Sequence, residues 1–599
     1  MTSMNDSEDA EYVIGLDIGD GESALAWLSV GDRELPEIFS RRHSGERSII
    51  TTLARKRSAT GQSSGWLIGE EAVVTSGAIQ LSVNFKHVPR RDEFGTPDAV
   101  LFAQALLEEF RQAHPDILQN CCIYLGHPSG WPDDAVATYR RHFAALDLPL
   151  RLMPESHSAL LYLKDRQMYG ESSLDRVLVV DIGSSTTDFT YVEDLTPENL
   201  PVGASLGCRA IDRKLADKVR TELEHDLTLA EALQADGGTD FLLLTCRWAK
   251  EAQFSGVPHR ILSRPEAHNT RFAPIVKRAW QWLQAVEIPA IVAESGGWLD
   301  EFHALLVSVR DQLGDRPPQL VVLTGGGSRM PCVRRACQAV FQDSVIHNDS
   351  EPSFAVARGL AINGRHRTNT RRFRQEMREL PSSPEFRNVV RREADHALSR
   401  VKQSLLERAS TSGIESVLHT LAHSQGAAGS DPDPAVDAGV RELVDAVNAA
   451  LGPKLLEICR RYAVPDDQFQ LTLTLPDVFS SRIAALVARR VTAIGWTEGA
   501  WEFTQNAARA TPHLYRLGRL LGGTKSPYAV PFAIGAAAVG GMVSLSGQVV
   551  ANQATKRILR ELRDVQLTKD AIQLILDEVT ESIVSQTDVR ARTVERFLF

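Results

Sequence analysis

The stretch VLVVDIGSSTTD, residues 177–188, carries the strongest indication of how this chain folds. Its four leading apolar residues predict a strand that is buried on both faces, and Asp-Ile-Gly then predicts a tight turn. The same pattern occurs at Tyr12–Leu16, whose apolar run also ends in Asp-Ile-Gly, and Leu320–Thr324 runs into three glycines. Helical spacing between these strands predicts an α/β fold. The helical stretches are Ala99–Ala113, Asp133–Ala145, Ser156–Lys164 and Cys208–Leu223.

The residues after the first two strands suit the binding of a polyphosphate. Each turn begins with an aspartate, Asp17 or Asp181, and the two lie 164 residues apart. Glycine lets backbone N–H groups approach an anion closely, and an aspartate at such a turn is suited to hold the waters of a Mg²⁺ ion. A single Asp-Ile-Gly is usually an ordinary turn at the end of a strand. Two such loops that face each other across a cleft would clasp a polyphosphate from both sides.

A third glycine-rich loop, Gly325–Gly327, follows the last of these strands and precedes a predicted helix at Cys332–Phe341. Its glycines allow the backbone to approach a sugar or a base, and Pro331 suits the first turn of a helix. Arg329 in the same loop is able to stack on a flat base, because the guanidinium group is planar. The alternative for Arg329 is an ordinary solvent-exposed arginine.

The order of these motifs between Glu11 and Asn363 resembles the ATPase domain of the heat-shock protein 70 (DnaK-type) chaperones, within the actin-like ATPase superfamily. This resemblance implies a two-lobed actin-like fold of ribonuclease-H-like repeats, with ATP and Mg²⁺ between the lobes. It also places Gly69 and Lys86 in the strand region that supplies the family's catalytic lysine. The stretches that carry the resemblance are Asp17–Ser23, Pro154–Ala159, Asp181–Phe189, Leu206–Asp212, Cys246–Glu251, Gly325–Pro331 and Glu351–Gly359.

The resemblance also implies a role for each residue of the site. Lys86 would contact the γ-phosphate, and Thr186 would help to align the attacking water. Glu155 and Asp181 would order the waters of Mg²⁺, and Asp17 with Asp181 would hold the metal through water. From the residues alone, Lys86 is equally an exposed lysine and Glu155 a capping or pairing residue of its own helix. The residues implied to bind the nucleotide are Gly19, Asp20, Gly21, Gly183, Ser184, Ser185, Lys250, Gly325, Gly326, Gly327, Arg329 and Ser353.

The sequence departs from the family pattern at two places in the expected site. Asp20-Gly21 replaces a Thr-Thr pair in the first loop. A carboxylate beside phosphate is repulsive unless Mg²⁺ offsets it, so we expect hydrolysis to be slow, altered or lost while binding survives. Arg247 and Glu251 stand where the family has a glutamate and an arginine, which is a swapped charge pair.

The C-terminal part of the chain does not resemble the family, which has a peptide-binding β-sandwich there. Residues 371–599 carry 29 Lys and Arg against 26 Asp and Glu, whereas the first 370 residues carry 37 against 50. This difference in charge supports a boundary near residue 370. The predicted parts are a disordered N-terminus (1–10), a DnaK-like ATPase domain (11–366), a basic linker (367–386) and a mainly α-helical C-terminal domain (387–599).

The composition indicates which partners and which cellular location are expected for the protein. A net charge of −10 argues against a nucleic-acid partner, because nucleic-acid scaffolds are normally basic. Seven cysteines without a C-x-x-C pair are typical of reduced thiols in the cytoplasm. No secretory signal is readable at the start of the sequence. Residues 526–555 contain no charged side chain, so they form either a closely packed buried helix or hairpin or a membrane-inserting segment.

The expected function is hydrolysis of ATP to ADP and phosphate, with the nucleotide state controlling how the helical C-terminal domain binds an unknown protein partner. One alternative is a nucleotide-sensing scaffold that does not hydrolyse ATP, which Asp20 and Gly21 would favour. Another is a small-molecule kinase of the same superfamily. Turnover measurements with and without an added metabolite would separate these three.

Overall fold

A computed structural model of the chain shows two compact units, with the division between Asn369 and Thr370. The first unit contains every predicted site residue. The structure describes residues 10–57, 63–90, 95–165, 175–193, 196–202, 205–257, 259, 261, 270–349, 351–412, 434–462, 556, 560, 563–564, 566 and 569–596.

The first sheet has the strand Tyr12–Ile18 (β1) at its centre. The strand order is β3-β2-β1-β8-β9, and β4 also pairs with β2. β1 is antiparallel to β2 and parallel to β8, which is parallel to β9. The remaining bounds are β2 (Glu22–Ser29), β3 (Glu37–Ile38), β4 (Ile49–Ile50), β8 (Cys121–His127) and β9 (Leu150–Pro154).

The second sheet repeats the topology of the first, with the order β12-β11-β10-β13-β14. The pairing directions also match, since β10 is antiparallel to β11 and parallel to β13, and β13 is parallel to β14. Asp17 and Asp181 therefore occupy equivalent places, each as the second-last residue of a central strand. The bounds are β10 (Arg176–Ile182), β11 (Thr187–Glu193), β12 (Thr196–Asn199), β13 (Leu320–Thr324) and β14 (Val345–Asn348).

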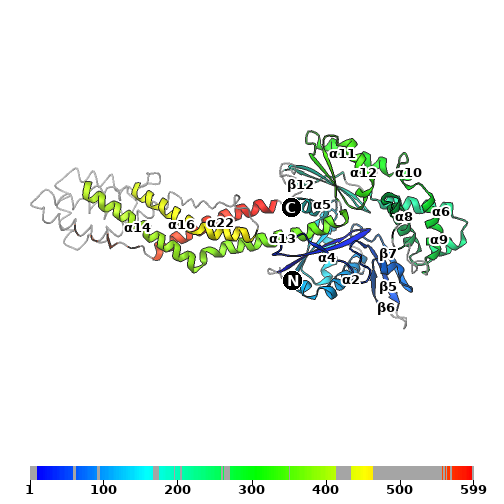
Figure 1. Ribbon diagram of the computed structural model, residues 1–599, viewed down its shortest axis with the longest axis horizontal. Coiled ribbons are helices and arrows are strands. Elements are labelled where there is room, and N and C mark those ends of the chain that lie inside the picture. The colour runs from blue at the N-terminus through cyan, green and yellow to red at the C-terminus, as the bar shows by residue number, and fades with distance from the viewer. Residues whose placement is uncertain are drawn as a thin grey trace, which may run out of the picture. The chain divides into compact units, whose positions relative to one another are not determined.

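Helices cover both faces of these two sheets, so the predicted α/β fold is confirmed (Figure 1). α2 (Asp98–Ala113) and α4 (Asp133–Phe143) share a buried core with one face of the first sheet, and α13 (Pro352–Glu379) packs on its other face. α11 (Trp298–Leu313) and α12 (Pro331–Val340) cover one face of the second sheet, and α5 (Glu155–Asp165) packs on the other. Further helices are α3 (Pro115–Gln119), α6 (Arg209–Glu222), α7 (Leu227–Gln234), α9 (Ala273–Ala285) and α10 (Ile288–Val292).

α5 and α13 approach each other more closely than side chains normally allow. α5 follows β9 and α13 follows β14, which is the last strand of the second sheet. A Cβ atom at Gly359 of α13 would lie 1.7 Å from the carbonyl oxygen of Ser158 in α5. Tyr162 of α5 is buried against Ala355 and Ile362 of α13 beside this crossing. Position 359 therefore requires glycine for the two helices to cross as they do.

A third, antiparallel sheet leads the chain to Lys86. Its order is β6-β5-β7. It packs against α8 (Gly238–Ser255), because Leu81 of β7 and Phe241 of α8 belong to one buried apolar core. The backbone N–H of Gln80 also donates a hydrogen bond to Asp236 at 2.8 Å. The bounds are β5 (Thr52–Arg57), β6 (Ser63–Ile68) and β7 (Ala78–Val83), with α1 (Glu70–Val74) after β6.

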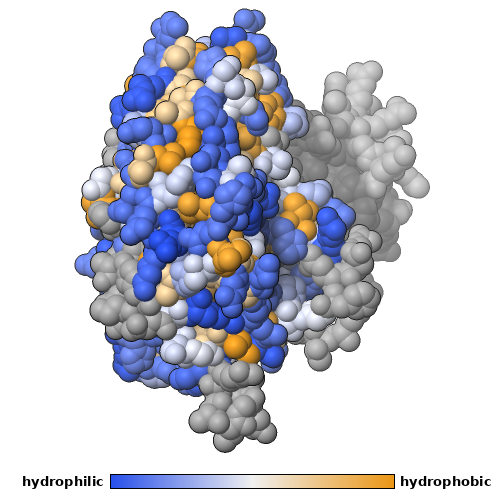
Figure 2. Space-filling view, turned by 90° about the vertical axis from the view of Figure 1, so that its right-hand side faces the viewer, coloured by the Kyte–Doolittle hydropathy of each residue, from blue (hydrophilic) through white to orange (hydrophobic). Residues whose placement is uncertain are grey.

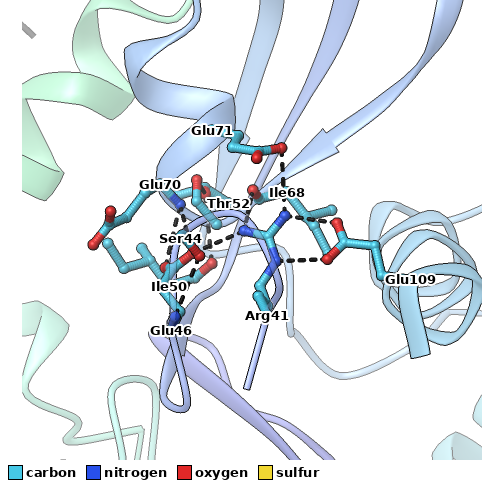
Figure 3. Close-up of polar contacts among 10 residues, drawn as sticks. Arg41, Ser44, Glu46, Ile50, Thr52, Ile68, Glu70, Glu71 and Glu109 are labelled. Atoms are coloured by element: carbon cyan, nitrogen blue, oxygen red, sulfur yellow. Dashed lines mark hydrogen bonds and ion pairs between the residues drawn. The ribbon is translucent and has the colours of Figure 1, made fainter. Parts of the chain in front are cut away.

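Arg41 holds the third sheet to the neighbouring helices through a buried ion cluster (Figure 3). Its side chain is 2% exposed and contacts both carboxylate oxygens of Glu109 in α2, at 2.6 and 2.9 Å. It also contacts Glu46 at 2.8 Å and donates to the carbonyl of Ile68 at 3.0 Å. Gly69 has a φ of +61° there, and a Cβ on it would lie 2.6 Å from the Arg41 guanidinium. Gly69 thus leaves the space that the Arg41 guanidinium occupies in this cluster.

Replacement of Arg41 by leucine is expected to destabilise the first unit by about 3 kcal/mol, because it leaves the buried carboxylate of Glu46 and the partly exposed one of Glu109 without compensation. The free energy of unfolding in urea measures the effect. Arg42→Leu is the matched control, because Arg42 is the next residue in the chain and its side chain is exposed. Its free energy of unfolding should stay within about 0.5 kcal/mol of that of the parent. Equal effects of the two substitutions would contradict the role assigned to Arg41.

The described part of the second unit is helical. The end of α13 shares a buried apolar core with α14 (Pro384–Ser412), α16 (Pro434–Arg461) and α22 (Lys569–Arg596). Residues 367–386, which the sequence suggested to be a polar linker, instead continue α13 to Glu379 and lead through a short 3₁₀ turn into α14. A helix accommodates these arginines because arginine has a high helix propensity. The predicted disordered N-terminus, apart from Ala10, and the uncharged segment 526–555 lie outside the described residues.

Within the residues that the structure describes, no helix is both long and apolar enough to cross a membrane. Figure 2 shows one face of the molecule, on which apolar residues lie in small groups among hydrophilic ones. Such scattered apolar residues are normal on a water-exposed surface.

Candidate functional site

All of the site residues predicted from the sequence line one pocket of the first unit, with a cavity volume of about 520 Å³. They come from three loops, from Lys86 after β7, from the starts of α5 and α13, and from α8, which supplies Lys250. Chain segments far apart in sequence are thus brought to one place. These residues are Asp17, Gly19, Asp20, Gly21, Lys86, Glu155, Asp181, Gly183, Ser184, Ser185, Thr186, Lys250, Gly325, Gly326, Gly327, Arg329 and Ser353.

Two aspartates at equivalent places in the two sheets make the pocket acidic. Burial, followed by the negative charge of Glu155, raises the pKa of Asp17 from its ordinary value of 3.8 to about 7. Burial and the charges of Glu155, Asp188 and Asp17 hold the pKa of Asp181 well above its ordinary value. The two aspartates therefore lie near enough to repel each other, at the ends of strands that belong to different sheets.

Lys86 is buried in the pocket and forms an ion pair with Glu155. Its side chain is only 3% exposed, so the alternative of an ordinary exposed lysine is wrong. Burial alone lowers the pKa of Lys86, but the neighbouring acidic groups, Glu155 foremost, outweigh it and raise the pKa above its usual range. Glu155 is the first residue of α5, and its carboxylate reaches across to Lys86. The pocket thus holds a fixed positive charge beside its acidic groups.

Thr186 in the second loop is oriented by a neighbour. Its hydroxyl donates a hydrogen bond to Asp188 Oδ2 at 2.8 Å. Because the proton is committed to Asp188, the oxygen lone pairs of Thr186 remain able to accept a hydrogen bond from a water in the pocket. Burial raises the pKa of Asp188 to about 6, although the bond from Thr186 opposes this.

Glu22 joins the first loop to three parts of the opposite wall. Ser353 at the start of α13 donates a hydrogen bond to it at 2.5 Å, and Arg247 of α8 approaches it to 3.5 Å. Arg329 of the third loop lies 3.9 Å from Glu22 and donates to Ser353 at 2.7 Å. Glu22 belongs to the first loop, but its sequence context predicts no role for it. The long-range contacts that define its role have no signal in the local sequence.

The swapped charge pair on α8 remains paired. Arg247 and Glu251 lie one helical turn apart and form an ion pair at 2.7 Å. A Cβ at Gly21 would lie 2.3 Å from the Arg247 guanidinium, so the first loop accommodates that arginine only with glycine. Lys250 is buried with Asp212 at 2.7 Å and lies at the pocket wall. Phe254 and Met330 also line the pocket and offer apolar surface that the sequence gave no reason to select.

Asp20, the unexpected carboxylate of the first loop, has a cationic partner. Arg209 at the start of α6 approaches it to 3.2 Å. Burial raises the pKa of Asp20, while Arg209 and a hydrogen bond with Ser184 lower it. Arg209 thus places an opposite charge beside Asp20, although burial outweighs it and the pKa of Asp20 stays raised.

The donor set fits a hydrated Mg²⁺ ion. Over the described ranges, no three His, Cys, Asp or Glu side chains are placed to ligate one ion directly. Mg²⁺ normally keeps several waters and binds through one or two carboxylates together with phosphate oxygens. The raised pKa values of Asp17 and Asp181 mark a place where added positive charge would relieve repulsion.

Comparison with known proteins adds no assignment to this geometry. No protein-family model matches the chain. No curated protein matches it either.

Proposed function

We propose that the protein is an ATPase of the actin-like superfamily that binds ATP with Mg²⁺ in this pocket and hydrolyses it to ADP and phosphate. The observation that carries this proposal is the pair of equivalent loops after β1 and β10, which line one pocket together with buried Lys86. The repeated sheet order and the crossing of α5 and α13 support a two-lobed fold of ribonuclease-H-like repeats.

In this proposal, catalysis consists of positioning and of charge compensation. Lys86 faces the terminal phosphate and offsets the charge that develops there. Thr186 accepts a hydrogen bond from the attacking water, whose oxygen bonds to phosphorus as the bond to ADP breaks. Asp17, Glu155 and Asp181 would hold the waters of a bound Mg²⁺ ion, which would supply positive charge beside the phosphates. The small residues of the three loops let backbone N–H groups contact the nucleotide.

Saturable binding of a fluorescent ATP analogue to the full-length protein, measured with and without Mg²⁺, tests the binding step. Release of inorganic phosphate tests turnover, and it distinguishes an ATPase from a nucleotide-sensing scaffold. Loss of ATP only in the presence of an added metabolite would favour a small-molecule kinase. No saturable binding at millimolar ATP would contradict the proposal.

The affinity for MgATP is expected to rise as the pH increases from about 6 to 8. Asp17 has a pKa of about 7 in the nucleotide-free protein, so below that pH it must lose a proton before it helps to hold a cation. The gain should approach tenfold per pH unit below 7. The same shift makes the nucleotide-free fold less stable as the pH rises from about 4 towards 7, because unfolded Asp17 ionises first. Titrations with MgATP at several pH values, each with a chelator control, measure the affinity. An affinity that falls as the pH rises would contradict the prediction.

We also propose that the nucleotide state controls partner binding by the helical C-terminal domain. What supports this is the fold of that domain: α14, α16 and α22 share a buried core with the end of α13, and the residues described there contain no strand like those of the family's β-sandwich. Affinity capture with the full chain loaded with ADP or a non-hydrolysable ATP analogue would test it. Identical sets of captured proteins in the two states would contradict it.

A further inference from the structure

Arg209 connects two functional segments although it does not itself line the pocket. It is the first residue of α6, and its Nη1 lies 3.3 Å from Asp20 Oδ1 and 3.2 Å from Asp20 Oδ2. The same nitrogen donates a hydrogen bond to the backbone carbonyl of Asn84 at 3.2 Å. Asn84 lies two residues before Lys86, so a single guanidinium reaches both the first loop and the segment that presents the buried lysine.

The charge of Arg209 matters because of what the first loop would bind. The side chain of Asp20 is 1% exposed and lies at the wall of the pocket, where it cannot be screened well by water. Two like charges a few ångströms apart repel strongly at a poorly hydrated site. An unpaired Asp20 would therefore oppose a polyphosphate in the first loop, and Arg209 removes that opposition.

The backbone contact of Arg209 matters for a different reason. Asn84 has a φ of +56°, which is the left-handed region that few non-glycine residues adopt. The hydrogen bond from Arg209 holds its carbonyl in that turn, and the chain then delivers Lys86 into the pocket. Small displacements of a charged group at a phosphoryl-transfer site are costly, because the group must meet the charge where it develops.

We propose that Arg209 is a positioning residue of the site, with two separable effects: it neutralises Asp20 so that the polyphosphate binds, and it fixes the turn that places Lys86. This inference rests on the proposed function and deepens it. Neutral hydroxyl residues in the first loop would need no partner, whereas the carboxylate of Asp20 needs Arg209 to compensate its charge. Hydrolysis in this chain is thereby compatible with a carboxylate in the first phosphate loop.

The test measures MgATP affinity and kcat for the full-length protein and four variants. Arg209→Met should weaken binding about tenfold or more, because Asp20 is left uncompensated. Adding Asp20→Asn to that variant should restore affinity to within about threefold of the parent, while kcat stays at least about tenfold lower because the Asn84 contact is still missing. Arg209→Lys keeps the charge and should bind within about threefold of the parent. Arg213→Met removes an exposed arginine from the same helix and should change neither quantity.

The outcomes separate the inference from the function on which it rests. If the parent protein shows no saturable MgATP binding, the proposed function fails and the role of Arg209 fails with it. If the parent binds and Arg209→Met binds equally well, only the role of Arg209 is overturned. A double variant that does not regain affinity also overturns the role of Arg209. If Arg209 were purely structural, removing the charge of Asp20 would not repair the loss caused by Arg209→Met. Should Arg209→Met fail to fold, a tenfold loss of affinity in Arg209→Lys would contradict the charge effect.

Discussion

Replacement of Lys86 by methionine is expected to lower kcat for ATP hydrolysis by about 10²- to 10³-fold. Lys86 is a buried cation of the pocket and forms an ion pair with Glu155. Removing one preorganised group that stabilises charge in a transition state typically costs this much. Steady-state phosphate release under saturating MgATP measures the effect.

Two further variants test whether the effect depends on the position of the positive charge. Lys56→Met removes an exposed lysine from β5 of the same small sheet and should leave kcat within about twofold of the parent. Lys86→Arg keeps a cation but changes its reach and geometry, so it should fold like the parent and still lose most of the activity. A Lys86→Met protein that is folded and retains normal turnover would rule out a role for this lysine in hydrolysis.

Replacement of Gly359 by alanine is expected to destabilise the first unit by about 3 kcal/mol or more and to abolish nucleotide binding. The new Cβ would lie 1.7 Å from the carbonyl oxygen of Ser158 and 2.3 Å from its carbonyl carbon. Because both neighbours are backbone atoms, the clash is relieved only if α5 and α13 move apart. Glu155 and Ser353 lie at the starts of these helices, so that movement would also displace pocket residues.

Gly452→Ala is a control at a helical glycine that is not packed against another helix. Gly452 lies inside α16, and a Cβ there would meet no atom within 4 Å. Alanine is favoured over glycine in a helix by about 1 kcal/mol, but Pro453 follows directly and disfavours a helical residue with a Cβ before it, so this variant should stay within about 1 kcal/mol of the parent. Differential scanning calorimetry follows the unfolding of the unit that holds each variant. A Gly359→Ala protein as stable as the parent would show that the two helices do not cross at this glycine.

The phosphate loops could be predicted from the sequence because their signals are local. A buried strand, an aspartate and a small-residue turn are adjacent in the chain, and their repetition at Asp17 and Asp181 predicted a paired site. Several helices were also predicted from their spacing, and α2, α5 and α12 lie within a few residues of the predicted bounds.

The contacts that complete the site could not be predicted, because they depend on the packing of distant segments. The pairing of Asp20 with Arg209 joins residues that are 189 positions apart, and that of Glu22 with Ser353 spans 331. Asp20 alone suggested repulsion, and the local sequence gave no sign that Arg209 places an opposite charge beside it. Similarly, the arginine-rich composition after residue 366 suggested a connector, yet the same residues extend α13.

The most direct measurement is a crystal structure of the full-length protein with Mg²⁺ and a non-hydrolysable ATP analogue. The expected result is a triphosphate between the loops after β1 and β10, with a hydrated Mg²⁺ ion near Asp17 and Asp181 and Lys86 facing the terminal phosphate. A nucleotide bound elsewhere, with these two loops free of phosphate, would contradict the central claim that the repeated aspartates form one phosphate-binding site.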